Sequence, residues 1–259
     1  MAEKETKNAP KDLIEAVPEE IAQLELEEVM EKEAPAEKII EESKKFGVSW
    51  IPKTKLGKLV REGKEKDIDK ILSHGKKILE PEIVDSLLDL TSDLLSIGQA
   101  KGKFGGGKRR AWRQTQKKTQ EGNIITFSAM AIVGDKKGHV GIGFGRAKET
   151  LPAREKAVRN AKLGIIKVNL GFESPEHERD KSDPHSIPFK VQGKCGSVRI
   201  TLWPAPRGTG LVINDECKKI LKLTGIRDVY SKTQGFTRTT FNLARACLNA
   251  LEKTTRIKA

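Results

Sequence analysis

Glycine at every second position of a short apolar run is the feature of this sequence that most restricts its fold. The run HVGIGFG occupies residues 139–145 and follows an apolar, β-rich run, NIITFSAMAIVG, after the turn signal DKKG. A helical stretch begins near Pro152, and GIIKVNL at 164–170 has the composition of another strand. Two such runs joined by a short turn predict a hairpin. We therefore expect a hairpin, a helix and a strand in this order.

The same glycines raise the question of a phosphate-binding loop. A dinucleotide-binding loop needs the pattern Gly-x-Gly-x-x-Gly. Here Arg146 stands where a third glycine would follow Gly141 and Gly143, and Lys148 stands where one would follow Gly143 and Gly145. The chain also has no P-loop, Gly-x-Ser-x-Gly or His-Glu-x-x-His motif. We predict that it is not an enzyme, and that the glycines allow either close packing of a helix or close approach of RNA.

A second series of alternating elements follows residue 180. The strand SVRITLWPA precedes the turn PRGTG, the strand LVIN, a helix over 216–223, the strand IRDVYSK, the loop TQGFTRTT and a helix over 241–252. Far upstream, the apolar residues between Pro81 and Leu95 have helical spacing. The expected fold class is α+β. The expected parts are a tail (1–45), a helical extension (46–97), a basic Gly-rich linker (98–112) and two small units of strands and helices (113–180 and 181–259).

Charge is distributed unevenly along the chain. The formal net charge is +13, whereas residues 1–42 contain five lysines and fourteen acidic residues, so the remainder carries a net charge of +22. A strongly basic body predicts a polyanionic partner such as nucleic acid. The acidic tail has few large apolar residues and is expected to be disordered or weakly helical. It either shields the basic body from wrong polyanions or has no dedicated role.

The most basic segment, residues 98–118, contains eight Lys and Arg residues and no acid. Such a segment cannot fold alone, but it can follow a phosphate backbone and become ordered on contact. The alternative is a flexible linker. Within it, Trp112 and Phe104 are candidates for stacking on bases. Further basic residues follow the glycine-rich strand and lie in the turn APRGTG. The candidate RNA-binding residues are Lys101, Lys103, Lys108, Arg109, Arg110, Arg113, Lys117, Lys118, Arg146, Lys148 and Arg207.

The sequence does not indicate metal, membrane or disulfide chemistry. Cys195, Cys217 and Cys247 lie far apart without a CxxC pair, so we expect reduced, structural cysteines rather than a nucleophile, a disulfide or a zinc site. His177 and His185 lie in a polar loop, which favours solvation over metal binding. No apolar run approaches the roughly 20 residues of a membrane span, and the start lacks a signal-peptide pattern. We therefore expect a cytoplasmic protein with no cofactor and no membrane contact.

Several motifs that occur in order resemble the universal small-subunit ribosomal protein five family. The stretch QKKTQEGNIITFSAMAIVGDKKGHVGIGFGRAKE is similar to the first domain of this family. HSIPFKVQGKCGSVRITLWPAPRGTGLV and LTGIRDVYSKTQGFTRTTFNLARACLNAL are similar to its second domain. WIPKTKLGKLV and EPEIVDSLLDL resemble an extension of the archaeal and eukaryotic members. The resemblance covers roughly residues 46–259 and indicates an archaeal-type member.

This resemblance implies a first domain similar to the double-stranded-RNA-binding fold, followed by a small α/β domain of the ribosomal-domain-two-like type. It implies a structural component of the small ribosomal subunit that binds small-subunit rRNA near the decoding region and the mRNA entry channel. The expected neighbours are mRNA and ribosomal proteins four and eight, and the expected roles are subunit assembly and translational accuracy.

In the family, a loop before the first strand reaches into rRNA, and it corresponds to residues 116–123 here. Asn123, where family members often have a basic residue, and the acidic Glu121 depart from the family pattern. The Gly-rich segment 101–110 is longer than usual, and we expect it to replace the charge that this loop has lost.

Two other functional classes stay open on the residues alone. One is a free double-stranded-RNA-binding regulator with the same fold. The other is a nucleotide-binding enzyme of the ribosomal-domain-two-like superfold, which the missing phosphate-binding motifs disfavour.

Overall fold

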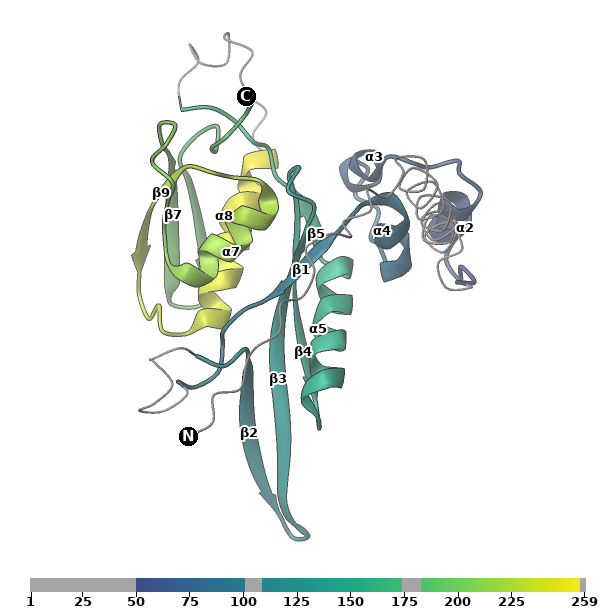
Figure 1. Ribbon diagram of the computed structural model, residues 1–259. Helices are drawn as coiled ribbons and strands as arrows, with labels where there is room; N and C mark the ends of the chain where they lie inside the picture. The colour runs from purple at the N-terminus through teal and green to yellow at the C-terminus, as the bar shows by residue number, and fades with distance from the viewer. Residues whose placement is uncertain (1–49, 101–108, 174–182, 257–259) are drawn as a thin grey trace, which may run out of the picture. The chain divides into compact units, whose positions relative to one another are not determined.

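The computed structural model describes residues 50–100, 109–173 and 183–256, and the described residues from Pro52 onward form one compact unit of two sheets and their helices (Figure 1). The first sheet has the order β1-β3-β4-β5, and β2 also pairs with β3. Its strands are β1 (Thr91–Leu94), β2 (Trp112–Thr119), β3 (Gly122–Gly134), β4 (His139–Ala147) and β5 (Ile165–Lys167).

Both β1 and β2 pair with the same edge of β3. β1 pairs antiparallel with residues 131–134, and β2 pairs antiparallel with residues 122–129. The long strand β3 is therefore covered on this edge by two strands that lie end to end. On its other edge, β3 pairs with β4 from Gly134 to Phe127. Residues 122–126 of β3 thus pair with β2 alone and form a two-stranded ribbon beyond the end of β4.

Helix α5 (Thr150–Leu163) lies directly against the backbone of β4. A Cβ atom on Gly143 would overlap backbone atoms of Ala157 and Ala161, and one on Gly145 would overlap backbone atoms of Ala153 and Ala157. Gly141 faces Ala161 in the same way. The alternating glycines therefore serve helix packing, the first of the two expected roles, because only a strand without side chains on this face admits a helix so closely.

The second sheet also has one glycine that lets a helix pack directly on a strand. Its order is β6-β7-β9-β8, with β8 and β9 parallel, and helix α8 covers β6 and β7. A Cβ atom on Gly193 of β6 would overlap the backbone of Ala246 and Ala250 of α8. The elements of this part are β6 (Val191–Cys195), β7 (Val198–Pro204), β8 (Leu211–Val212), α7 (Asp215–Thr224), β9 (Val229–Gln234) and α8 (Thr240–Arg256).

One hydrophobic core joins the two sheets. Met130, Ile132 and Val140 of the first sheet belong to the same buried cluster as Ile200 and Leu202 of the second. Helices α7 and α8 fill the space between the sheets, so the layers run α5, first sheet, α7 with α8, second sheet (Figure 1). Consequently the first sheet is covered on both faces over much of its length, whereas no helix packs on the outer face of the second sheet in the described part of the chain.

In the described part of the chain, three short helices precede the first sheet, and a charged cluster attaches one of them to it. They are α2 (Lys55–Arg61), α3 (Ile68–Ser73) and α4 (Pro81–Leu87). His139 of β4 places Nδ1 2.6 Å from Oδ2 of Asp135 and Nε2 2.8 Å from Oδ1 of Asp69 on α3. Lys167 Nζ donates to the second carboxylate oxygen of Asp69 at 2.7 Å.

The pKa values in this cluster follow from its geometry. The hydrogen bond to Asp135 is the main cause that raises the pKa of His139, and it outweighs the effect of burial. Burial alone would raise the pKa of Asp135 and of Asp69. The hydrogen bond from His139 to Asp135, and those from Lys167 and His139 to Asp69, reverse this and leave both pKa values below the ordinary 3.8. A protonated His139 between two carboxylates thus links α3 to the sheet.

Two sequence-based expectations about secondary structure are wrong in part. The helix expected from Pro81 to Leu95 ends at Leu87, and residues 91–94 form β1. The leucines of this segment fit a strand as well as a helix, and backbone pairing with β3 decides between them. The basic segment 98–118, expected to be unfolded without a partner or to be a flexible linker, forms a strand over its last third, because residues 112–118 belong to β2. Apolar alternation did not predict this strand, because most of its side chains are polar.

The histidine and cysteine expectations can also be compared with the structure. His185 is not solvated but buried, with Nδ1 3.0 Å from Oδ2 of Asp228, whereas His177 lies outside the described residues. Cys195, Cys217 and Cys247 are free thiols; Cys217 and Cys247 are buried, and Cys195 is half-buried. The strand β6, which the sequence did not predict, precedes β7 and carries Gly193 at the helix contact.

Candidate nucleic-acid interface

The ribbon formed by β2 and the start of β3 is the most exposed part of the first sheet. The turn consists of Gln120 and Glu121, and Gly122 has φ +117°, which favours glycine. Ile124 and Ile125 are 43% and 40% exposed. The segment 116–123, expected as a loop that reaches into rRNA, is thus the end of a hairpin. A two-stranded ribbon is marginally stable by itself, so contact with a partner would stabilise this one.

Three of the candidate RNA-binding residues share one face of this sheet. Arg113 is paired with Ser128, and Ser128 is paired with Arg146, so the two arginines stand in one row across three strands. Their backbones are about 10 Å apart, since neighbouring strands are spaced by about 4.8 Å. Lys117, two positions beyond Thr115 on β2, points to the same face near the turn. All three side chains are exposed.

Hydrogen bonds hold Arg146 in position on this face. Its Nη2 and Nε donate to Oγ1 of Thr126 at 2.9 and 3.3 Å. The Thr126 hydroxyl also lies 2.8 Å from that of Thr115 on β2. These contacts use two of the five guanidinium N–H donors. The remaining donors are available to an anion, and the side chain is already oriented.

The exposed face of the first sheet begins at the point along β4 where helix α8 no longer covers it. Phe144, two positions before Arg146 on β4, packs edge-to-face on Phe241 in the first turn of α8 with ring centroids 5.3 Å apart. Residues farther along β4 toward His139 belong to the core between the sheets. None of β2, β3 and β4 contains an acidic residue. The cationic face, defined here as Arg113, Lys117 and Arg146 with the threonines between them, is therefore free of carboxylates on its strands.

The other candidate residues are not part of the cationic face. Arg109 and Arg110 are exposed and lead into β2; the Arg110 carbonyl accepts from Gly98 N at 2.8 Å. Lys118 directly follows Lys117 on β2, and successive side chains of a strand point to opposite faces, so Lys118 points to the opposite side of the ribbon. Lys148 lies between β4 and α5. Lys101, Lys103 and Lys108 lie outside the described residues.

Arg207 lies far along the chain in the loop after β7, at the second sheet. Its Nη2 donates to the carbonyl of Asp183 at 3.2 Å. Buried Asp228 holds the end of this loop by accepting from Gly210 N at 2.7 Å. Ser186 Oγ accepts from Ala205 N at 3.2 Å and donates to the carbonyl of Asp228 at 2.7 Å. Arg207 thus stands on a supported loop, but it is separate from the cationic face.

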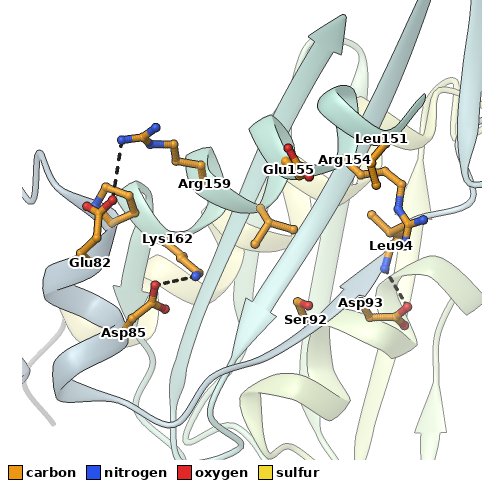
Figure 2. A pocket seen from close by; sticks show the side chains of 12 residues that line it. Glu82, Asp85, Ser92, Asp93, Leu94, Leu151, Arg154, Glu155, Arg159 and Lys162 are labelled. Atoms are coloured by element: carbon orange, nitrogen blue, oxygen red, sulfur yellow. Dashed lines mark hydrogen bonds and ion pairs between the residues drawn. The ribbon is translucent and has the colours of Figure 1, made fainter. Parts of the chain in front are cut away.

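A hollow between α4, β1 and α5 is a poor candidate for an active site. Figure 2 shows that four of its charged side chains form two ion pairs: Lys162 with Asp85 at 2.7 Å and Arg159 with Glu82 at 3.8 Å. These pairs join α4 to α5. The described residues contain no group of three or more His, Cys, Asp or Glu side chains that could hold a metal ion. Among the same residues, no helix is long and apolar enough to cross a membrane.

Sequence reasoning missed a second set of exposed basic and aromatic residues. They lie on the outer face of the second sheet. The signal was present as alternation in VRITLW, where Val198, Ile200 and Leu202 are buried and the residues between them point outward. The unpredicted strand β6 supplies its neighbour.

Comparison with known proteins agrees with this architecture. Models of the ribosomal protein S5 family match residues 110–169 for the N-terminal domain and residues 193–259 for the C-terminal domain. The small ribosomal subunit protein uS5 of Nanoarchaeum equitans is 50% identical over 210 residues, which cover 81% of this chain and 89% of the relative. The proteins of the same name from Methanospirillum hungatei and Hyperthermus butylicus are each 45% identical, over 81% and 79% of this chain and 94% and 89% of the relatives.

Proposed function

The chain belongs to the ribosomal protein S5 family, and from this premise we propose that its cationic face binds small-subunit rRNA. The protein is a structural, non-enzymatic component of the small ribosomal subunit, as the names of its relatives indicate. The observation that carries the proposal for the face is the row formed by Arg113 and Arg146, with Lys117 beyond it and no acid on the three strands.

Elementary electrostatics explains why this face suits RNA. Lysine and arginine displace counterions from a phosphate backbone, and this release supplies most of the sequence-independent affinity. Arg146 is oriented before binding by Thr126, so less side-chain freedom is lost when a phosphate is bound. The hairpin beyond it is narrow and exposed, which suits contact with an irregular rRNA surface. Support for a relation to the double-stranded-RNA-binding fold comes from the antiparallel strands β3, β4 and β5 with α5 packed on one face.

The finer placement in the subunit rests on the family resemblance. On this basis, the protein lies near the decoding region and the mRNA entry channel, next to ribosomal proteins four and eight, in the cytoplasmic ribosome. There it supports assembly and translational accuracy. The segment 101–110 would add to the rRNA contact. Its deletion is expected to lower incorporation into subunits, and unchanged incorporation and fidelity would contradict this role.

The main test reverses charge on the cationic face of the full chain. The double variant Arg113→Glu and Arg146→Glu is expected to bind small-subunit rRNA at least tenfold more weakly, with a smaller dependence on salt, because each lost phosphate contact lowers the slope by about one. Sedimentation through a sucrose gradient would show less tagged protein with the small subunit.

The matched control carries the same change in charge on the solvent side of α5. Arg154→Glu and Lys156→Glu alter two exposed residues that are not on the cationic face. We expect this variant to retain most of its rRNA affinity. An equal loss in both folded variants would show that net charge alone matters and would overturn the assignment to this face. Recovery of the unaltered protein only in the free fraction would overturn the ribosomal role.

A further inference from the structure

The outer face of the second sheet carries an ordered array of cations and aromatic rings. Strands β6 and β7 alternate between inward residues that face α8 and residues that point away from it, and β9 continues the outward rows beside β7. In register, Lys194 stands opposite Arg199, Thr201 stands opposite Lys232, and Trp203 stands opposite Tyr230. We call these six residues the open sheet face.

Its cations are placed where they repel one another. Lys194 and Arg199 form a direct cross-strand pair, and like charges in such a pair destabilise a sheet. Lys232 lies one row away on the next strand. None of the three forms an ion pair with a carboxylate within the described ranges, and β6, β7 and β9 contain no acidic residue. Binding of an anion would relieve this repulsion.

Aromatic rings occupy the third row of the same face. Tyr230, the single tyrosine of the chain, is 43% exposed, and Val212 beside it on β8 is 49% exposed. Trp203 is half-buried, and Lys190 places its Nζ 5.4 Å from the centre of a Trp203 ring. Trp203, with a lysine already at one ring, and Tyr230 are therefore two neighbouring, partly exposed rings that offer a platform for planar groups.

A protein partner fits this combination less well than RNA. An apolar docking surface would exclude cations from its centre, whereas here lysine and arginine occupy two of the three rows. Cations that follow a backbone, together with aromatic rings on a sheet, are the elements that bind unpaired RNA. We propose that the open sheet face binds a single-stranded segment of RNA, with bases stacked on Trp203 and Tyr230 and phosphates at Lys194, Arg199 and Lys232. This inference rests on the proposed rRNA-binding function and adds a second surface to it.

The two RNA surfaces should prefer different RNA. On the cationic face, Arg113, Lys117 and Arg146 are separated by Thr115, Thr126 and Ser128 and have no aromatic ring between them, so that surface reads phosphates. On the open sheet face, stacking requires bases that are not already stacked in a duplex. A variant of each surface should therefore affect one form of RNA more than the other.

The first experiment measures binding of the full-length protein to a fluorescein-labelled 12-nucleotide uridine oligomer and to a 16-base-pair RNA duplex. The double variant Trp203→Leu and Tyr230→Leu is expected to bind the oligomer at least tenfold more weakly, since stacking on an aromatic side chain contributes about 1–3 kcal/mol per base. Its binding to the duplex should change less than twofold. The matched control is Phe236→Leu, which removes an aromatic ring that is 61% exposed but lies in the loop after β9.

A variant that keeps both rings guards against a folding defect. Arg199→Gln with Lys232→Gln leaves the platform intact and should weaken oligomer binding severalfold with a reduced dependence on salt. The inference fails if both variants of the open sheet face bind the oligomer like the unaltered protein. If the Arg113→Glu and Arg146→Glu variant still binds small-subunit rRNA more weakly in that case, the proposed function stands. If the variant of the cationic face also binds small-subunit rRNA like the unaltered protein, the proposed function itself fails.

The second experiment uses assembled small subunits. Ultraviolet crosslinking followed by mass spectrometry is expected to find nucleotide adducts on Trp203 or Tyr230. Amine-reactive crosslinks from Lys194 and Lys232 to another ribosomal protein, without nucleotide adducts on the two rings, would show that a protein covers this face and would overturn the inference.

Discussion

The contact of β4 with α5 and the contact of β6 with α8 use the same means to different extents. Three glycines of β4 admit α5 along three turns marked by Ala153, Ala157 and Ala161, whereas Gly193 alone admits α8 over Ala246 and Ala250. Helices α7 and α8 cover the other face of the first sheet. In the described part of the chain, no helix covers the outer face of the second sheet. Because a covered face cannot bind a ligand, the first sheet exposes its cations only beyond the end of β4, and the second exposes them along its strands.

The largest expected effect comes from breaking the β4–α5 contact. Gly143→Val places a branched side chain where even a Cβ atom would overlap the backbone of Ala157 and Ala161. We expect a loss of more than about 4 kcal/mol in the free energy of unfolding, or no folded protein. Chemical denaturation of the variant measures this loss. Gly164→Ala is the control, because its Cβ would meet other atoms no closer than 3.5 Å.

Gly193→Ala tests whether a single glycine matters as much to α8. Its Cβ would overlap the backbone of Ala246 and Ala250, so β6 or α8 must shift. We expect a loss of about 2–3 kcal/mol, as for an overpacked core. The denaturation midpoint gives the value. A loss below about 0.5 kcal/mol would show that the edge strand β6 can move, and that the second contact is less rigid than the first.

The cluster around His139 gives a smaller effect with a defined dependence on pH. The raised pKa of His139 means that its protonated ring stabilises the fold below pH 6.5, and that this contribution is lost as pH rises through the raised pKa. The lowered pKa values of Asp69 and Asp135 add stability above pH 3.8 that is lost as pH falls. The cluster should therefore contribute most between these limits.

His139→Gln is expected to lower the free energy of unfolding by about 1.5–3 kcal/mol near pH 6, the range for hydrogen bonds to charged groups. The loss should shrink toward pH 9. Unfolding curves for both proteins from pH 5 to 9 measure the difference, and a loss that does not depend on pH would contradict a protonated ring.

The smallest effect concerns reactivity rather than stability. Cys217 on α7 and Cys247 on α8 lie buried between the two sheets. The hydrogen bond with the Cys217 thiol and burial raise the pKa of Cys247 well above its usual value. Half-buried Cys195 on β6 should therefore react first with iodoacetamide, and mass spectrometry of the folded protein should find a single alkylated thiol. Simultaneous labelling of all three would show that the layer between the sheets opens readily.

Much of this fold could be predicted from the sequence, since its patterns are local. Apolar alternation predicted β3, β4, β7 and β9, and helical spacing predicted α5, α7 and α8 within a few residues of their observed ends. The polar strand β2 escaped because neither of its faces is buried. β1 escaped because leucines at positions 87, 88, 90, 94 and 95 fit a helix as well as a strand. In both cases, pairing with β3 supplied the information that the local sequence lacked.

The candidate surfaces divide in the same way. The excess of lysine and arginine, the lack of catalytic motifs and the alternating glycines are properties of the sequence. They already indicated a polyanion as partner and a strand that either a helix or RNA approaches closely. Which cations act together depends on strand register. Register places Arg113 in one row with Arg146 although they are 33 positions apart, turns Lys118 to the opposite side and brings Lys194, Arg199 and Lys232 onto one face. Since hydrogen bonds between distant segments fix the register, only the tertiary structure could decide these groupings.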